Sequence, residues 1–308
     1  MDNSTETRFN PYLAVILSVL AVSFGSIFTR LASAPPLVIA FYRLGFTFLL
    51  LTPFMASRRW RAEIAAVSRS DLLLAVLSGG FLAAHFGVWI TSLSYTSIAS
   101  STVLVTMQPL FVVTLGGLLL KEKVGWRSAA GAAIALIGSV VVGAGDFQVG
   151  GTAFWGDLLA FAGAFFIAVY VLIGRGLRAR LSLLPYVYLV YGTAALLLLV
   201  YNLMKGIPLY PYPPMDWLWF LGLAVIPTIM GHTVFNWALR YVRAAVVSVS
   251  ILGEPVGATI LGYLILGEVP GGWTLFGGAI IVLGLYLFIS STREEGEKNN
   301  LSGYEGDL

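Results

Sequence analysis

Long apolar stretches separated by short polar breaks run through almost the whole chain. A helix needs about 20 apolar residues to cross the roughly 30 Å hydrocarbon core of a membrane. The breaks between the stretches carry Pro, Gly or charged residues, and none is long enough to hold a soluble domain. The pattern predicts an all-α membrane protein with ten transmembrane helices. These are expected near residues 11–31, 36–57, 71–94, 97–120, 126–143, 153–174, 183–204, 215–239, 245–267 and 273–291.

The composition points to lipid as the solvent of this protein. Hydrophobic residues make up 58% of the 308 positions and charged residues only 11%. Soluble domains carry roughly 25% charged residues, so a chain of this length could not hide so much apolar surface from water. The sequence contains no cysteine, which excludes disulfides, thiolate catalysis and cysteine-bound metals. No cofactor is expected.

The distribution of basic residues predicts how the chain is oriented in the membrane. With the N-terminus in the cytoplasm, fifteen Lys and Arg residues fall on the cytoplasmic side, against Arg30 and Lys205 outside and Arg43 within a span. An excess of Lys and Arg is typical of the cytoplasmic loops of membrane proteins. We therefore predict a multi-pass protein of the plasma (inner) membrane with both termini cytoplasmic. Because these residues are divided among six short segments, the expected partner is the lipid bilayer and not nucleic acid.

Two segments 146 residues apart resemble each other. Residues 108–125 and 254–271 share seven of eighteen aligned positions, including Pro109 and Pro255. Five spans per half is an odd number, so the second half would enter the membrane from the opposite side and form an inverted repeat. This interpretation divides the chain into a cytoplasmic N-terminus (1–10), a first five-helix repeat (11–143), a second five-helix repeat (144–291) and a cytoplasmic polar tail (292–308).

With these motifs in order, the chain resembles the EamA-type branch of the drug/metabolite transporter superfamily. The resemblance rests on ten spans, on two repeats, and on the sequences Leu-Leu-Leu-Lys-Glu at 118–122 and Leu-Ile-Leu-Gly-Glu at 264–268. Arg43 matches a frequent second-span Arg of that family, while Phe24 stands where the family often has Trp. The resemblance implies two five-helix halves around a central cavity and export of amino acids or related small metabolites. It does not identify the substrate.

A carboxyl group within a span marks one candidate site. Glu254 lies deep in the ninth span, directly before Pro255, and Gln108 occupies the equivalent position in the fourth span. A charge at the centre of a bilayer costs about 2.5–3.5 kcal/mol on insertion scales, so such residues are rare. Glu254 could bind a substrate ammonium group or carry a coupling proton. Alternatively, it is a structural residue that is protonated or paired with Arg43.

Two histidines lie on spans three and eight, and each has a partner one helical turn later on the same face. Trp89 follows His85, and Asn236 follows His232. We expect these four residues to line the cavity. The alternative is that the two histidines only form hydrogen bonds with neighbouring backbone groups. No cluster of further ligands accompanies them, so a metal site is not expected.

Arg43 is the basic residue within a span, about 10 Å from the outer end of the second helix by the helical rise. It could hold a substrate carboxylate through two parallel hydrogen bonds, balance Glu254, or bind exposed carbonyl groups. Arg43 and Glu254 together would suit a zwitterionic amino acid.

The predicted function is a carrier that moves a small-molecule substrate outward by alternating access, with amino acids as the preferred class and a coupling proton as an option. The oligomeric state is not predicted. A nucleotide-sugar or phosphate-ester antiporter would need several basic residues in the cavity. The sequence offers only one, Arg43. An intramembrane enzyme would need paired catalytic residues that the spans lack, and a membrane scaffold would leave Glu254 without a role.

Overall fold

The computed structural model describes residues 9–96, 98–119, 124–144, 151–267 and 269–305, with backbone alone for 98–100, 143–144 and 293–305. Within these ranges the regular structure is helical, and no strand occurs. Nine described segments are long and apolar enough to cross a membrane. The fifth predicted span forms α7, of which Trp126–Val142 is described as a shorter apolar helix. The all-helical membrane architecture is therefore confirmed, with nine spans of full length in the described chain.

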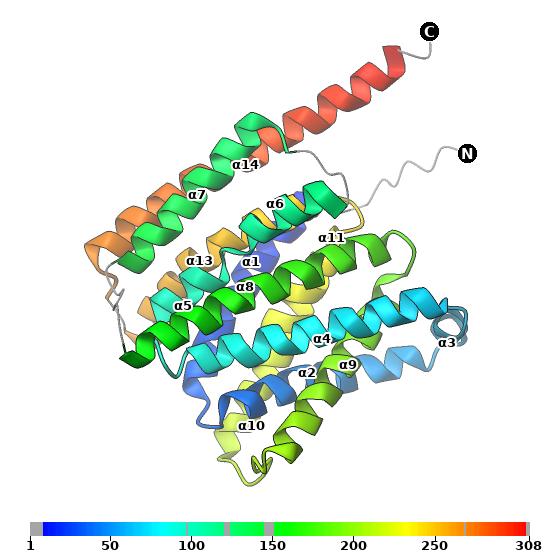
Figure 1. Ribbon diagram of the computed structural model, residues 1–308, viewed down its shortest axis with the longest axis vertical. Coiled ribbons are helices and arrows are strands. Elements are labelled where there is room, and N and C mark those ends of the chain that lie inside the picture. The colour runs from blue at the N-terminus through cyan, green and yellow to red at the C-terminus, as the bar shows by residue number, and fades with distance from the viewer. Residues whose placement is uncertain (1–8, 97, 120–123, 145–150, 268, 306–308) are drawn as a thin grey trace.

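The helices follow the order of the predicted spans (Figure 1). The first half contains α1 (Pro11–Leu31), α2 (Pro36–Met55), α3 (Arg58–Ala65), α4 (Arg69–Ser92), α5 (Ile98–Val105), α6 (Gln108–Leu119) and α7 (Trp126–Ala144). The second half contains α8 (Gly151–Arg178), α9 (Leu183–Met204), α10 (Pro214–Leu223), η1 (Ala224–Thr233), α11 (Val234–Ala238), α12 (Ala244–Ser250), η2 (Ile251–Gly253), α13 (Glu254–Leu261), η3 (Gly262–Leu266) and α14 (Gly272–Glu305).

The fourth and ninth spans are broken at equivalent positions. The fourth span is interrupted at 106–107, and α6 then begins with Gln108 and Pro109. In the ninth span, α12 gives way to the 3₁₀ turn η2, and α13 begins with Glu254 and Pro255. Proline has no N–H to donate to the preceding turn, which explains a break just before it.

The eighth span contains a π-helix where the sequence pattern predicted a regular α-helix. This segment, η1, surrounds Pro227, and its side-chain hydrogen bonds span five residues. Thr228 Oγ1 donates to the carbonyl of Leu223 at 2.7 Å, and Thr233 Oγ1 donates to the carbonyl of Thr228 at 3.1 Å. Proline removes one backbone donor, and a wider turn accommodates the loss. The distortion places Thr228 beside the second helix.

Helices α7 and α14 lie side by side (Figure 1) and pack backbone against backbone. A Cβ atom on Gly131 would lie 2.9 Å from the carbonyl oxygen of Gly284, and one on Gly138 would lie 2.8 Å from that of Gly277. The two helices therefore run antiparallel. Gly131 and Gly277 are 146 residues apart, as are Gly138 and Gly284, so a shift by one repeat exchanges the two contacts. Small residues allow this close approach in lipid.

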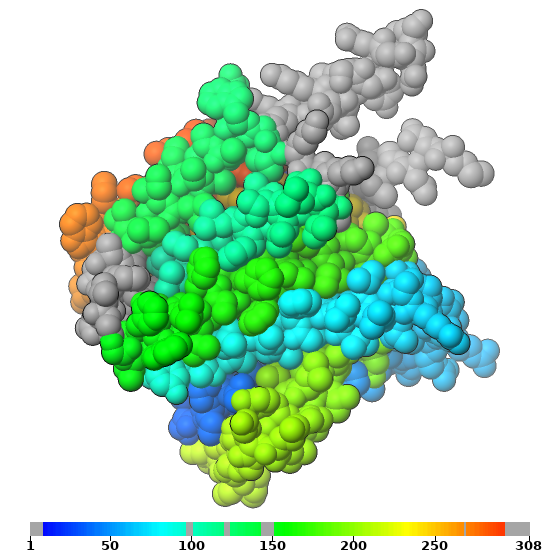
Figure 2. All heavy atoms as spheres, in the orientation of Figure 1, coloured from blue at the N-terminus to red at the C-terminus, as the bar shows by residue number. Residues whose placement is uncertain are grey.

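The remaining helices enclose α1, which packs against η1, α10, α11 and α13. Helix α2 packs on α9, and α4 packs on α8, with which it covers the middle of the face drawn in Figure 2. Two helical segments were not predicted. The break after the second span forms the short helix α3, and α14 continues to Glu305, beyond the predicted end of the last span at 291.

Candidate functional site

A cavity of about 30 Å³ lies where the two halves meet. Six of the seven residues predicted for the substrate site line it, contributed by α2, α4, α6, η1 and α13. They are Arg43, His85, Trp89, Gln108, His232 and Glu254, joined by Val22, Phe86, Val105, Thr106, Ile167 and Ile251. By the criterion that about 10–15 Å³ admits one water molecule, the cavity has room for about two.

Arg43 is held at this cavity from two directions. Its side chain is 1% exposed, and its Nε atom donates to Thr228 Oγ1 at 2.8 Å. The guanidinium carbon lies 4.1 Å from the centre of the Phe86 ring, a cation–π contact. These contacts leave the Nη1 atom buried without a hydrogen-bond partner. Arg43 is thus fixed in position with a donor still available.

Two further side chains at the cavity carry buried donors without partners. They are the indole Nε1 of Trp89 and the amide Nε2 of Gln108. A buried donor without an acceptor costs about 1–3 kcal/mol, and more if it is charged. Three such donors, including Arg43 Nη1, therefore line one small cavity. An acceptor-rich group in the cavity would relieve this cost.

Glu254 supplies the acidic side chain of the cavity and is 8% exposed. No ion pair within 4.0 Å joins it to Arg43, although both side chains are described. The backbone carbonyl of Glu254 accepts a hydrogen bond from Ser23 Oγ at 3.4 Å, which ties α13 to α1. The alternative in which Arg43 and Glu254 form a direct structural pair is therefore wrong for this conformation.

The two histidines flank the ring of Phe86. His85 stacks on Trp89, with ring centres 6.0 Å apart, and its Nδ1 lies 2.9 Å from the carbonyl oxygen of Gly163. A carbonyl only accepts hydrogen bonds, so Nδ1 carries the proton. The ring of His232 meets Phe86 edge-on at 5.4 Å. Among the described residues, no group of three or more His, Asp or Glu side chains is placed to hold a metal ion.

Asn236 lies outside the wall of the cavity, contrary to its expected place with His232. Its amide nitrogen donates to the hydroxyls of Tyr170 and Tyr191 and to the carbonyl of His232. The two tyrosines come from α8 and α9 and draw the amide into the protein interior. Tyr191 also bonds Thr233 at 3.0 Å.

A second buried pair accompanies this network. The hydroxyl of Tyr186 lies 3.1 Å from that of Ser78, and both side chains are fully buried. We refer to Ser78, Tyr170, Tyr186, Tyr191, Thr233 and Asn236 together as the tyrosine layer. Sequence reasoning missed its role because a tyrosine in a span is equally compatible with ordinary helix packing.

A wider hollow of about 880 Å³ adjoins the inner cavity; we call it the vestibule. On four segments its lining begins within about one helical turn of the cavity. The vestibule residues Ser26, Ile90, Thr102 and Pro255 lie within four positions of the cavity residues Val22, Trp89, Thr106 and Glu254, respectively. The vestibule also includes Arg30, Ser94 and Thr274, at the end of the bundle where α1 and α4 finish.

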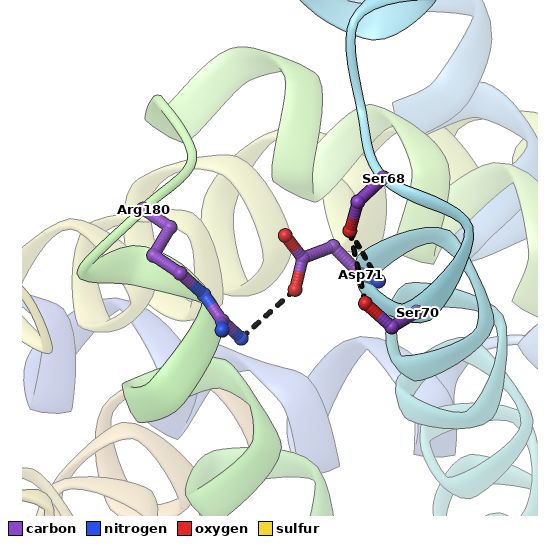
Figure 3. Close-up of polar contacts among 4 residues, drawn as sticks. All are labelled: Ser68, Ser70, Asp71 and Arg180. Atoms are coloured by element: carbon purple, nitrogen blue, oxygen red, sulfur yellow. Dashed lines mark hydrogen bonds and ion pairs between the residues drawn. The ribbon is translucent and has the colours of Figure 1, made fainter.

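The opposite end of the bundle is joined by polar contacts between the halves. Asp71 at the start of α4 forms an ion pair with Arg180 at 2.9 Å, while Ser68 Oγ accepts a hydrogen bond from the Asp71 N–H (Figure 3). Nearby, the Ser182 N–H donates to the carboxylate of Glu63 at 2.7 Å. An exposed ion pair contributes roughly 0–1 kcal/mol, so these contacts fasten this end only lightly.

The comparisons with known proteins agree with this architecture. An uncharacterized transporter of Archaeoglobus fulgidus is 26% identical over 274 residues, covering 89% of this chain and 94% of that protein. A probable terminal-alkyne amino-acid exporter of Streptantibioticus cattleyicolor is 29% identical over 191 residues, covering 61% and 63%. A solved crystal structure with 20% sequence identity has a TM-score of 0.76 and the same fold, over 92% of this chain and 98% of that one.

The family match falls on both halves of the chain. The EamA-like transporter family is matched twice, by residues 10–144 and by residues 154–290. The family is therefore matched by two successive regions of this chain, and the relatives are named as transporters. The resemblance seen in the sequence motifs is thereby confirmed. This chain belongs to the EamA-like transporter family and is a membrane transporter.

Proposed function

We propose that the protein exports small metabolites, with amino acids or related compounds as the substrate class, by alternating access. The observation that carries this proposal is the inner cavity, which brings one basic and one acidic side chain, Arg43 and Glu254, together without an ion pair. Isolated charges in a membrane protein are costly and mark substrate or ion pathways. A zwitterion would complement both side chains at once.

The two ends of the bundle support a carrier with alternating access. The vestibule leads toward the inner cavity from one end, whereas the Ser78–Tyr186 contact of the tyrosine layer and the Asp71–Arg180 pair join the halves elsewhere. In alternating access, one side opens while the other closes around a central site. We infer that the other state separates Ser78 from Tyr186 and narrows the vestibule.

The packing of α7 on α14 supports an inverted repeat with ten crossings. Antiparallel helices whose contacts exchange under the 146-residue shift fit a two-fold axis lying in the membrane plane. In this proposal α7 crosses the membrane as the fifth span, despite its shorter described apolar part. Both termini then lie on the cytoplasmic side of the plasma (inner) membrane, and the vestibule faces outward because the basic segments favour the inside.

The rival functions explain less of the cavity. A nucleotide-sugar or phosphate-ester antiporter would require several cationic side chains, yet among the described residues lining the inner cavity Arg43 is the cationic one. An intramembrane enzyme or a scaffold would not require unpartnered donors beside a vestibule.

The proposal is tested by efflux from proteoliposomes containing the purified full-length chain. Vesicles are loaded with a labelled panel of amino acids, small amines and organic acids, and efflux is followed with and without a pH gradient. We expect efflux of at least one amino acid, lost in Arg43→Gln and Glu254→Gln. Arg127→Gln, an exposed arginine on α7, is the matched control. Efflux of none of the panel above the level of empty vesicles would reject the carrier.

A further inference from the structure

The three unpartnered donors have different chemistry but share one position. Arg43 Nη1, Trp89 Nε1 and Gln108 Nε2 come from α2, α4 and α6, and each is buried without an acceptor in a residue that lines the inner cavity. None of the three atoms can itself accept a hydrogen bond. Their convergence therefore calls for a ligand group that presents several acceptors and carries negative charge.

The size of the cavity limits what that group can be. Room for about two water molecules matches the two oxygens of a carboxylate. A phosphate, with its larger set of oxygens, or a whole metabolite would not fit in this conformation. Only one functional group of the substrate can therefore occupy the inner cavity, and the remainder must lie elsewhere.

The part of the substrate that does not fit the inner cavity can lie in the vestibule. It is far larger, at about 880 Å³, and begins within about one turn of the cavity. Its wall nearest the cavity combines the apolar residues Ile90 and Pro255 with the hydroxyls of Ser26 and Thr102. A space of this volume accommodates apolar side chains of different length and shape.

Glu254 lies at the boundary between the two spaces. It lines the inner cavity, and the next residue, Pro255, lines the vestibule. Its carboxylate would repel a simple anion in the cavity but attract an ammonium group one or two bonds away from the bound carboxylate. The boundary thus favours a molecule in which both charged groups are attached to one carbon atom.

We propose that the inner cavity is a head-group site for α-amino acids, in which Arg43, Trp89 and Gln108 bind the carboxylate and Glu254 binds the ammonium group. The side chain of the substrate lies in the vestibule. This inference rests on the proposed carrier function and adds where each part of the substrate binds. It follows that the protein discriminates strongly at the head group and weakly at the side chain.

The test measures ligand-induced thermal stabilisation of the purified full-length chain, which does not depend on transport. Twenty amino acids are compared with the amide and N-acetyl derivatives of those that stabilise. We expect several amino acids with different apolar side chains to raise the melting temperature, and both derivatives to fail. Trp89→Phe and Gln108→Met remove single donors and retain bulk. Each should weaken apparent affinity about tenfold, as expected for one hydrogen bond to a charged group.

Trp126→Phe, a change at an exposed tryptophan on α7, is the control and should bind as the wild type does. The head-group site is wrong if amides stabilise as well as the free acids, if both donor variants bind like the wild type, or if no amino acid stabilises. Should proteoliposomes then still export another metabolite, the carrier proposal stands without the head-group site. Absence of all export would instead reject the carrier itself.

Discussion

The Nε atom of Arg43 donates to Thr228 Oγ1 at 2.8 Å, which joins α2 of the first half to the π-helical segment η1 of the second. Thr228 in turn donates to the carbonyl of Leu223, five residues earlier. The guanidinium is therefore positioned by a threonine whose own location depends on the wide helical turn around Pro227. A change in η1 would move the main positive charge of the inner cavity.

Removal of the Thr228 hydroxyl, which accepts the hydrogen bond from Arg43, should impair transport more than stability. Thr228→Val preserves side-chain shape but leaves Arg43 Nε without its partner, a cost of about 1–3 kcal/mol. We expect a reduced rate of substrate efflux and a lower melting temperature, with Thr228→Ser restoring both. Thr52→Val, at an exposed threonine that bonds only its own helix, is the control. Normal efflux in Thr228→Val would show that Arg43 needs no support from η1.

The glycine contacts between α7 and α14 make a second prediction. A Cβ atom on Gly284 would lie 2.3 Å from the Ala135 nitrogen, closer than atoms can approach. Gly284→Ala must therefore push the two helices apart, at a cost of about 1–3 kcal/mol by analogy with overpacking in cores. We expect a clear fall in melting temperature in detergent.

Gly176→Ala supplies the matched comparison, because nothing lies within 4 Å of a Cβ atom at that helical position. This change should leave stability unchanged or raise it slightly, since alanine favours a helix by about 1 kcal/mol over glycine. Equal melting temperatures for the two variants would contradict the close packing of α7 on α14.

The membrane-spanning helices and most residues of the candidate site could be predicted from the sequence. Apolar length determines a span, and rare polar residues within spans marked Arg43, His85, Gln108, His232 and Glu254, which the cavity brings together. Helical spacing also placed Trp89 over His85.

Other features depend on contacts that a linear pattern does not contain. Phe86 looks like any apolar residue in a span, yet Arg43 lies over its ring. Asn236 was misplaced because two tyrosine hydroxyls from other helices bind its amide. Residues 120–122 of the first repeat motif and residue 268 of the second lie outside the described residues.

The tyrosine layer yields a prediction about the balance between the two states. Tyr186→Phe keeps the ring but removes the hydroxyl that contacts Ser78 of the first half. One such hydrogen bond is worth about 1 kcal/mol net, so the closed arrangement should lose roughly fivefold in relative population. Because the natural chain has no cysteine, a single Thr106→Cys reports access to the cavity.

In this experiment, Thr106→Cys should react faster with a thiol reagent supplied on the cytoplasmic side when Tyr186→Phe is added. Tyr201→Phe, at an exposed tyrosine on α9, is the control and should leave the labelling rate unchanged. An unchanged rate in the Tyr186→Phe protein would show that the Ser78–Tyr186 contact does not hold the closed state.

Labelling of single cysteines can also show on which side of the membrane the vestibule opens. Ser94 lines the vestibule and is exposed, whereas Ser70 is exposed at the opposite end, beside the Asp71–Arg180 pair (Figure 3). If basic segments face the cytoplasm, a membrane-impermeant maleimide added to intact cells should label Ser94→Cys and spare Ser70→Cys. Inverted vesicles should give the reverse. Labelling of Ser70→Cys in intact cells would place the vestibule on the cytoplasmic side, and the proposed outward-open state would then be inward-open.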